Sequence, residues 1–285
     1  YSIEVRKSFS QFLEHINPTI IHGHNIYGGL SSSIIDAAKK NKIPFVLTLH
    51  DYKIICPSYL MLNHGKTCQD CLSGHYIYCL KNRCHKNNLL SSSVYMAESY
   101  FNKWTRKYEN VNAFICPSKF LMKLIEKAGF QREKLFYLRN PIDIANVDPV
   151  YKPGDYALFV GRLSHEKGVI TLIKAAGKSK VPLKIVGGGP EEEKCRVTVE
   201  QMELSNVSLE GYLSGNKLEA AYKNAAFIVI PSECYENAPM SIIEAYAYGK
   251  PVLGSKIGGI PEMIMEGVTG GLFVSGEVED LADKM

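Results

Sequence analysis

The sequence contains no apolar run that approaches the roughly 18 residues a helix needs to span a bilayer, so no membrane-spanning helix is expected within it. It contains no Asp-x-Asp pair, and we therefore expect no catalytic divalent metal. It lacks the G-x-G-x-x-G spacing of a dinucleotide site, which disfavours a nicotinamide-dependent oxidoreductase. The first residue is not Met and the last residues follow a helical pattern. We therefore expect part of a longer chain that lacks an initial strand or two and some final helices.

The 285 residues are enough for two domains, and 46% hydrophobic with 22% charged residues is typical of a globular protein. Short apolar segments alternate with helical patterns, such as 4–16, 27–40 and 94–107, which predicts an α/β fold with parallel sheets. Strands are expected at 19–22, 44–49, 113–116, 135–138, 156–160, 183–187, 207–211, 226–230, 252–255 and 272–274. The proline-rich segment 141–154 is expected to link a first domain, 1–145, to a second, 146–285.

Three histidines fall at or just after the first two predicted strands, where parallel sheets carry their functional groups. They are His22, His24 and His50. For His22 and His24 we favour loop histidines that bond to backbone. For His50 we favour a functional role, because an imidazole in a cleft can position a sugar hydroxyl or titrate near neutral pH.

Five cysteines, together with three histidines, crowd into the polar segment 52–93. The thiols are Cys56, Cys68, Cys71, Cys79 and Cys84. No secretory signal is recognisable, which disfavours disulfides. Paired thiolates at the Cys68/Cys71 and Cys79/Cys84 spacings can form a structural zinc site, with Cys56 as a spare ligand. The segment reads as too polar and irregular to pack as a helix pair, so a metal would supply its missing core. Free thiols or partial disulfides are the alternatives.

The charge is uneven along the chain. Eleven Lys and Arg residues lie between Lys81 and Lys134, against four acids. Such a basic stretch suits an anionic partner such as a membrane surface, a lipid phosphate or a nucleic acid, and equally suits a well-solvated surface.

The stretch 231–259 organises the second half. An apolar strand runs into a polar loop, and Pro239 is expected at the first position of a helix that runs to about Tyr248 and stops at Gly249. Glu236 lies in the loop and Glu244 lies along the helix, so two carboxylates bracket a helix N-terminus that favours anions. A plain surface strand–helix junction with two solvated glutamates is the alternative.

Two further strand–loop–helix junctions point to the same sheet edge. The first carries Gly161, Arg162 and Lys167, which makes a second anion cradle with two cations. The second carries Gly187, Gly188 and Gly189, which permit close backbone approach.

Taken in order, these segments resemble a known family. V-G-R-L-S-H-E-K-G (160–168), V-G-G-G-P (186–190), P-S-E-C-Y-E-N-A-P-M-S-I-I-E-A (231–245), G-K-P-V-L (249–253) and I-G-G-I-P-E (257–262) occur at its spacing. The chain resembles the retaining glycosyltransferases of family 4, with the GT-B fold, in which two Rossmann-like domains face a cleft. The likeness is strong over 156–275 and weaker over 19–50 and 111–143. The cysteine-bearing H-D-Y…C-P segment is similar to that of polysaccharide-assembly members.

The resemblance implies a role for each matching residue. Arg162 and Lys167 would bind the donor diphosphate in place of a metal. Glu244 would hold the ribose, and Glu236 would contact the transferring sugar. The N–H groups near Met240 and Ser241 would meet the phosphates. Ala238 and Pro239 would belong to the same donor site. Gly187–Gly189 and Tyr212 would flank the base, and His50 would reach the sugar. The implied mechanism is a front-face displacement in which the diphosphate oxygen deprotonates the acceptor.

The implied activity is transfer of a sugar from a UDP- or GDP-sugar to a glycan or polyprenyl-lipid-linked acceptor in cell-surface polysaccharide synthesis. With the basic stretch, it suggests a cytoplasmic protein bound peripherally at the inner face of the plasma membrane, with no nucleic-acid partner. The alternatives are another GT-B sugar-nucleotide enzyme, such as an epimerase or a phosphorylase, a non-catalytic sugar-nucleotide binder, and a zinc-organised interaction module. The family's N-terminal glycine-rich loop and last helices are not in this sequence, so the acceptor cannot be read from it.

Overall fold

The computed structural model describes residues 1–145 and 147–285. The fold is α/β, as the sequence predicts, and the chain divides into two compact units, Tyr1–Arg139 and Asn140–Met285. The sequence placed the division a few residues later, between 145 and 146. The difference arises because Asn140 already belongs to the second unit, where its side-chain amide lies 3.4 Å from the carbonyl oxygen of Ala238.

The N-terminal unit is built on a four-stranded parallel sheet in the order β1-β2-β5-β6. Its strands are β1 (Ile21–His24), β2 (Phe45–Thr48), β5 (Ala113–Cys116) and β6 (Leu135–Tyr137). Each lies within two residues of its predicted position. Phe45, Leu47 and Phe114 are almost fully buried and anchor the core of this unit.

Two helices that accompany this sheet correspond to the predicted patterns 4–16 and 27–40, and a third follows β5. They are α1 (Ile3–Ile16), α2 (Ser33–Lys40) and α5 (Lys119–Lys127). The expectation that α2 would begin at residue 27 is wrong, because residues 27–32 form turns. The Ser33 hydroxyl donates to the carbonyl of Leu30 and lies 2.8 Å from the Ser31 hydroxyl. Such local serine bonds compete with helix formation.

The cysteine-bearing segment has a small core of packed side chains. It contains a short hairpin, β3 (Leu62–Asn63) and β4 (Lys66–Thr67), and the helix α3 (Ile77–Lys81), which packs against α4 (Leu89–Trp104). Tyr76 stands edge-on to Tyr100 of α4 at 5.2 Å, next to the buried Cys79. Aromatic packing of the α3 region on α4 therefore supplies the small core that the sequence seemed to lack. The single turn η1 (Lys107–Asn110) follows α4.

The C-terminal unit contains a six-stranded parallel sheet in the order β12-β11-β10-β7-β8-β9. Its strands are β7 (Tyr156–Val160), β8 (Leu183–Val186), β9 (Val207–Gly211), β10 (Ala225–Ile230), β11 (Val252–Ser255) and β12 (Gly270–Phe273). All six lie within two residues of their predicted positions. Three single 3-10 turns lie in loops. The N-terminal unit contains η2 (Arg132–Lys134), and the C-terminal unit contains η3 (His165–Lys167) and η4 (Ile260–Glu262).

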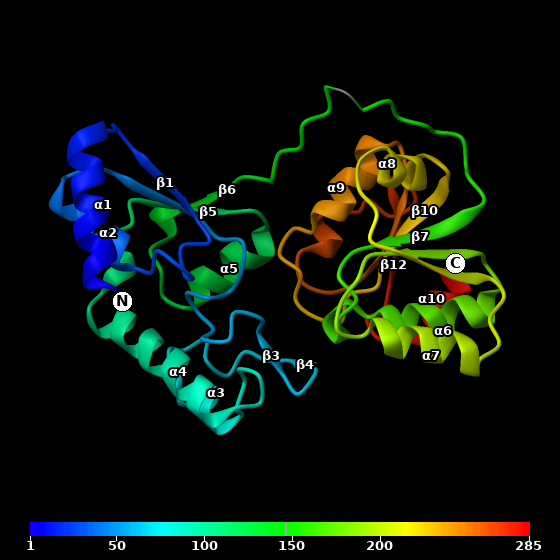
Figure 1. Ribbon diagram of the computed structural model, residues 1–285, viewed down its shortest axis with the longest axis horizontal. Helices are drawn as coiled ribbons and strands as arrows, with labels where there is room; N and C mark the ends of the chain where they lie inside the picture. Colours follow the sequence, from blue (N-terminus) through cyan, green and yellow to red (C-terminus); the bar gives the residue numbers. More distant parts are fainter. Residues whose placement is uncertain (146) are drawn as a thin grey trace. The chain divides into compact units, whose positions relative to one another are not determined.

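Helices cover both faces of this second sheet, as Figure 1 shows. The helices α6 (Val169–Ser179), α7 (Glu192–Gln201) and α10 (Val278–Lys284) lie together on one face, and α8 (Gly215–Lys223) and α9 (Met240–Ala247) lie on the other. Successive residues of β7 belong alternately to the two hydrophobic cores of this unit, with Phe159 in one core and Leu158 in the other. A parallel sheet buried on both faces leaves its carboxyl edge as the place for polar groups.

No helix in the described part of the chain is both long enough and apolar enough to cross a membrane.

Candidate active site

One cavity of about 410 Å³ in the C-terminal unit gathers most of the residues that the sequence singled out. Eight predicted donor residues line it: Gly161, Arg162, Lys167, Glu236, Pro239, Met240, Ser241 and Glu244. They follow the carboxyl ends of β7 and β10 or belong to the start of α9. The first and last of them, Gly161 and Glu244, are 83 positions apart in the sequence. The parallel sheet brings these strand ends to one edge, which is why the motifs converge.

The start of α9 presents backbone donors to the cavity. The first N–H groups of a helix have no acceptor within it, and Met240 and Ser241 occupy the first two helical positions. Pro239 is the N-cap, and its ψ of 125° places it outside the helix. The prediction that Pro239 would be the first helical residue is therefore wrong by one position. The helix ends with Tyr248 as its C-cap and Gly249 in a left-handed conformation, as expected.

An ion pair joins the two sequence motifs at the centre of the cavity. Lys167 Nζ lies 2.6 Å from Glu236 Oε1, and the Ser232 hydroxyl donates to the same oxygen at 2.7 Å. The Lys167 side chain is 31% exposed and that of Glu236 is 12% exposed, so the pair is partly shielded from water while Lys167 remains accessible.

The Glu236 carboxylate keeps Lys167 charged. Burial lowers the pKa of Lys167, but attraction to the Glu236 carboxylate and the hydrogen bond to it outweigh burial, so the pKa lies above its ordinary value. Lys167 is therefore a permanent cation at neutral pH and can meet an anionic ligand as one.

Arg162 lies in the same cavity but is held differently. It follows β7 in an exposed position and has no ion-pair partner within the described residues. A guanidinium presents five N–H donors, so Arg162 is available to a phosphate group.

Glu244 is oriented by a residue that the sequence reasoning missed. The hydroxyl of Tyr222, on α8, donates to Glu244 Oε2 at 2.8 Å, and the Tyr222 ring stacks on Tyr248 at 5.1 Å. Burial, followed by the negative charge of Glu244, raises the pKa of Tyr222, so the phenol stays protonated and remains a donor. No local motif marks Tyr222, because its role depends on the packing of α8 against β10.

The predicted glycine loop supports the cavity from behind. A Cβ atom at Gly187 would lie 1.8 Å from the carbonyl oxygen of Gly161, and one at Gly189 would lie 2.4 Å from that of Leu163. The loop therefore needs glycine in order to pack on the Gly161–Leu163 turn. None of the predicted donor residues Gly187, Gly188, Gly189, Ala238 and Tyr212 is among the lining residues, and Tyr212 is 82% exposed.

A second glycine contact was also missed. Gly258 has a φ of +60°, and a Cβ atom there would lie 2.4 Å from the carbonyl oxygen of Glu236. The N–H of Gly259 donates to that same oxygen at 2.7 Å. The I-G-G segment therefore fixes the backbone that carries the Glu236 carboxylate.

His50, the remaining predicted catalytic residue, lies in the N-terminal unit at the carboxyl end of β2. Its Nε2 lies 2.8 Å from Nδ1 of His24, while His22 Nε2 lies 2.7 Å from the Thr48 hydroxyl. The expectation that His22 and His24 would bond to backbone is not met, since both contact side chains. Burial lowers the pKa of both His24 and His50, and neighbouring imidazoles lower it further.

The five cysteines of the insertion line one small cavity. Among the described residues, however, no group of three or more His, Cys, Asp or Glu side chains is placed to hold a metal ion, and all the cysteines are free thiols. Burial raises the pKa of Cys68 to about 11 and that of Cys71 to about 12, so both are neutral thiols. The structure does not support the structural zinc predicted on Cys68, Cys71, Cys79 and Cys84, with Cys56 as a spare ligand.

Comparison with known proteins agrees with this geometry. The family model for glycosyl transferases group 1 matches residues 143–285, and the model for glycosyltransferase family 4 matches residues 1–146. An uncharacterised glycosyltransferase of Methanocaldococcus jannaschii is 27% identical over 76% of the chain and 64% of its own length. A lipopolysaccharide 1,2-N-acetylglucosaminetransferase of Salmonella typhimurium is 29% identical over 57% of the chain and 49% of its own length.

Among solved structures, Anabaena HepE in complex with UDP superposes with a TM-score of 0.70 at 19% identity, covering 98% of this chain and 70% of that protein. The chain covers 64% of the length of the Methanocaldococcus relative and 49% of the length of the Salmonella relative, which is less than two thirds of either protein. The two family models together match the described chain from end to end, and the fold is that of the solved structure. The chain therefore belongs to the GT-B glycosyltransferases of the family 4 type.

Proposed function

We propose that the protein transfers a sugar from a nucleoside diphosphate sugar to a glycan or lipid-linked acceptor in cell-surface polysaccharide synthesis, with retention of anomeric configuration. The Lys167–Glu236 pair carries the proposal. It joins a cation and a carboxylate at 2.6 Å in the cavity that also holds Arg162 and the start of α9. The Salmonella relative, named as a lipopolysaccharide N-acetylglucosaminetransferase, supports the polysaccharide role.

In this proposal the diphosphate lies at the start of α9. The N–H groups of Met240 and Ser241 donate to its oxygens, and Arg162 and Lys167 neutralise the charge that develops as the sugar leaves. These two cations supply the positive charge that a divalent metal gives other transferases, so we propose metal-independent transfer. Glu244 binds the ribose hydroxyls in the orientation set by Tyr222.

Glu236 contacts the transferring sugar and stabilises oxocarbenium character at its anomeric carbon. The bond from that carbon to the diphosphate oxygen breaks, and a bond to the acceptor oxygen forms on the same face. The acceptor proton moves to the departing diphosphate oxygen. Gly187–Gly189 and Tyr212 lie beside the base, and Ala238 completes the loop over the phosphates.

The donor base is either uracil or guanine. The bound UDP of Anabaena HepE favours uracil by likeness of fold alone. A thermal-shift screen over UDP-, GDP-, ADP- and dTDP-sugars identifies the donor, because a ligand at 100 times its dissociation constant adds about 2.7 kcal/mol of stability.

We further propose that the basic stretch from Lys81 to Lys134 holds the protein at the anionic inner face of the plasma membrane, near a lipid diphosphate acceptor. Sedimentation with anionic liposomes at low salt tests this directly. Binding that weakens as salt is added supports the proposal, and a protein that stays in the supernatant at low salt contradicts it.

The decisive experiment measures donor turnover in the presence of acceptor, with the anomeric configuration of the product read by NMR. Lys167→Ala should lower turnover by about 10² or more, because it removes a fixed charge that stabilises the transition state. Lys178→Ala is the matched control, since Lys178 forms a surface ion pair with Glu279 outside the cavity. Equal turnover in both variants, or an inverted product, would contradict the proposal.

A further inference from the structure

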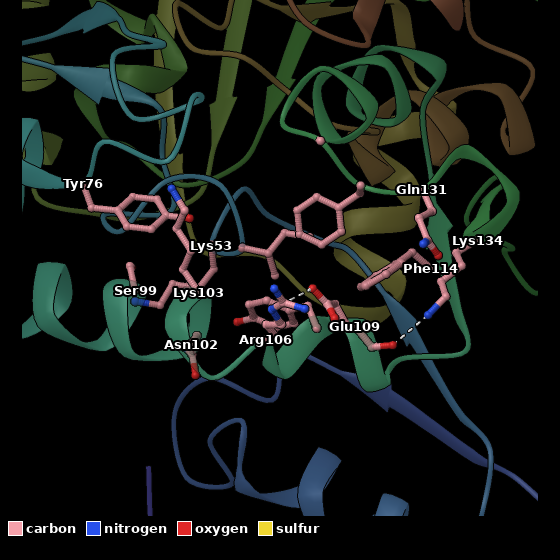
Figure 2. Close-up of a pocket in the computed structure, with 14 residues that line it drawn as sticks. Lys53, Tyr76, Ser99, Asn102, Lys103, Arg106, Glu109, Phe114, Gln131 and Lys134 are labelled. Carbon is pink, nitrogen blue, oxygen red and sulfur yellow. Dashed lines mark hydrogen bonds and ion pairs between the residues drawn. The ribbon is translucent and has the colours of Figure 1, made fainter.

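The N-terminal unit contains a second large cavity, of about 460 Å³, that no step of the proposed transfer uses. Its lining residues all lie between Lys53 and Lys134, and include Tyr108, Phe114, Gln131 and two further cations, Lys103 and Arg106. Figure 2 shows Tyr76, Lys53 and Lys103 on one side and Phe114, Gln131 and Lys134 on the other, with Arg106 and Glu109 between them. A volume in this range is typical of small-molecule sites.

None of the clustered histidines His22, His24 and His50 lines this cavity. Tyr108 and Glu109 precede β5, Gln131 and Lys134 precede β6, and Gly129 follows α5. These residues lie near the amino-terminal ends of strands, whereas Lys53 and Ile54, which also line the cavity, follow β2. Within its unit, the cavity is therefore separate from the histidine cluster.

Part of the wall is apolar and rigid. Ile54 and Phe114 are almost fully buried, and Phe130 stands edge-on to Phe114 at 5.4 Å. Tyr76 adds a further ring to the wall. Such a surface binds the apolar body of a ligand through area removed from water.

The rest of the lining carries an excess of positive charge. Lys53 is neutralised within the fold, because its Nζ lies 2.8 Å from a Glu98 carboxylate oxygen. The other lining cations are Lys103, Arg106 and Lys134, and the lining contains one carboxylate, that of Glu109. Three cations and one anion leave two net positive charges around the cavity.

These cations keep spare donors. Lys103 donates to the carbonyl of Gly74 and Lys134 donates to those of Glu109 and Val111, although each ammonium carries three N–H groups. Arg106 has only a long contact, 3.7 Å from Nε to Glu109. Burial raises the pKa of Tyr108, so its phenol remains a neutral donor. The polar part of the lining is therefore dominated by donors.

From this charge, volume and apolar wall, we propose that the cavity binds a phosphate monoester with an apolar body. A phosphate monoester carries close to two negative charges at neutral pH and accepts several hydrogen bonds, which matches the lining better than a monoanion. The apolar body would lie against Phe114 and Phe130. The site is independent of the donor cavity, whose residues all belong to the C-terminal unit.

Calorimetric titration of the whole chain with phenyl phosphate tests the proposal, with inorganic phosphate and phenol as the two halves of the probe. Phenyl phosphate should bind more tightly than either half. Arg106→Gln should weaken it about tenfold, as expected for loss of a hydrogen bond to a charged group. Arg106 is an exposed side chain, so the variant should fold normally.

Two variants serve as controls. Arg83→Gln removes an exposed arginine of the same unit that does not line the cavity, and Lys167→Ala alters the donor site. Both should bind phenyl phosphate as the unaltered protein does. Loss of binding only in Lys167→Ala would place the probe in the donor cavity and overturn the proposal. Equal binding of phenol, or no binding of phenyl phosphate, would overturn it as well.

Discussion

At the scale of single residues, the candidate site depends on side chains that hold other side chains in place. Lys167 and Glu236 hold each other, and Ser232 adds a second hydrogen bond to the carboxylate. Tyr222 does the same for Glu244 from the opposite side. Lys167, Glu236 and Glu244 are thus positioned before any ligand arrives, which reduces the cost of ordering them on binding.

Tyr222→Phe isolates one of these contacts. Loss of the 2.8 Å hydrogen bond should free Glu244 from the orientation proposed for ribose binding and cost about 1 kcal/mol of folding stability. We expect the KM for the donor to rise severalfold while kcat changes little, because the ribose lies away from the reacting carbon. Steady-state kinetics and thermal unfolding measure the two effects. An unchanged KM with reduced stability would leave Tyr222 a purely structural residue.

The histidine cluster predicts how stability depends on pH. Burial, with help from adjacent imidazoles, holds the pKa of His24 and His50 below 6.5 in the folded unit. The unfolded chain therefore binds protons that the folded unit does not, and acidification through the ordinary value favours unfolding.

We expect the unfolding temperature to fall between about pH 7.5 and about pH 5.5, as these groups approach their ordinary pKa range. His24→Gln should make that fall shallower, since it removes one of the two imidazoles whose pKa is lowered. Differential scanning calorimetry across this range measures the slope. A slope identical in the variant and the unaltered protein would contradict the assignment.

At the scale of elements, the site depends on loops that only glycine can form. Gly258→Ala should disturb Glu236, because its Cβ atom would lie 2.4 Å from a backbone oxygen in a left-handed conformation. Gly211→Ala is the matched control, with a φ of +69° and open space around the new Cβ atom.

We expect the control to lose only about 1–2 kcal/mol of stability from its conformation, with turnover retained. Gly258→Ala should lose more stability and most of its turnover. Chemical denaturation and donor turnover compare the pair. Similar losses in both variants would show that the close approach to Glu236 has no functional consequence.

The strand positions could be predicted from the sequence because each strand is a short apolar run bounded by glycine, proline or polar residues. The Pro239–Gly249 helix was located to within one residue for the same reason. Failures came where contacts are non-local. Residues 27–32 turn through serine hydrogen bonds, and the cysteine segment gains its core from Tyr100 of α4. Tyr222 and Gly258 entered the site only through packing that no local spacing reveals.

At the scale of the whole molecule, each unit has a parallel sheet and a core of its own. The C-terminal unit contains the candidate donor cavity, and the N-terminal unit contains the histidine cluster and the cation-lined cavity. The sequence motifs converge on the C-terminal site because strand ends meet at one sheet edge. The central claim is therefore that fixed cations and the start of α9 recognise a diphosphate.

Titration calorimetry with UDP, UMP and uridine, and with the matching guanine series, tests that claim most directly. The account predicts that the diphosphate binds at least about tenfold more tightly than the monophosphate, since the second phosphate gains charge-assisted hydrogen bonds. It also predicts that Arg162→Ala removes most of this advantage while leaving uridine or guanosine binding unchanged. Equal affinity for diphosphate and monophosphate in the unaltered protein would contradict the account.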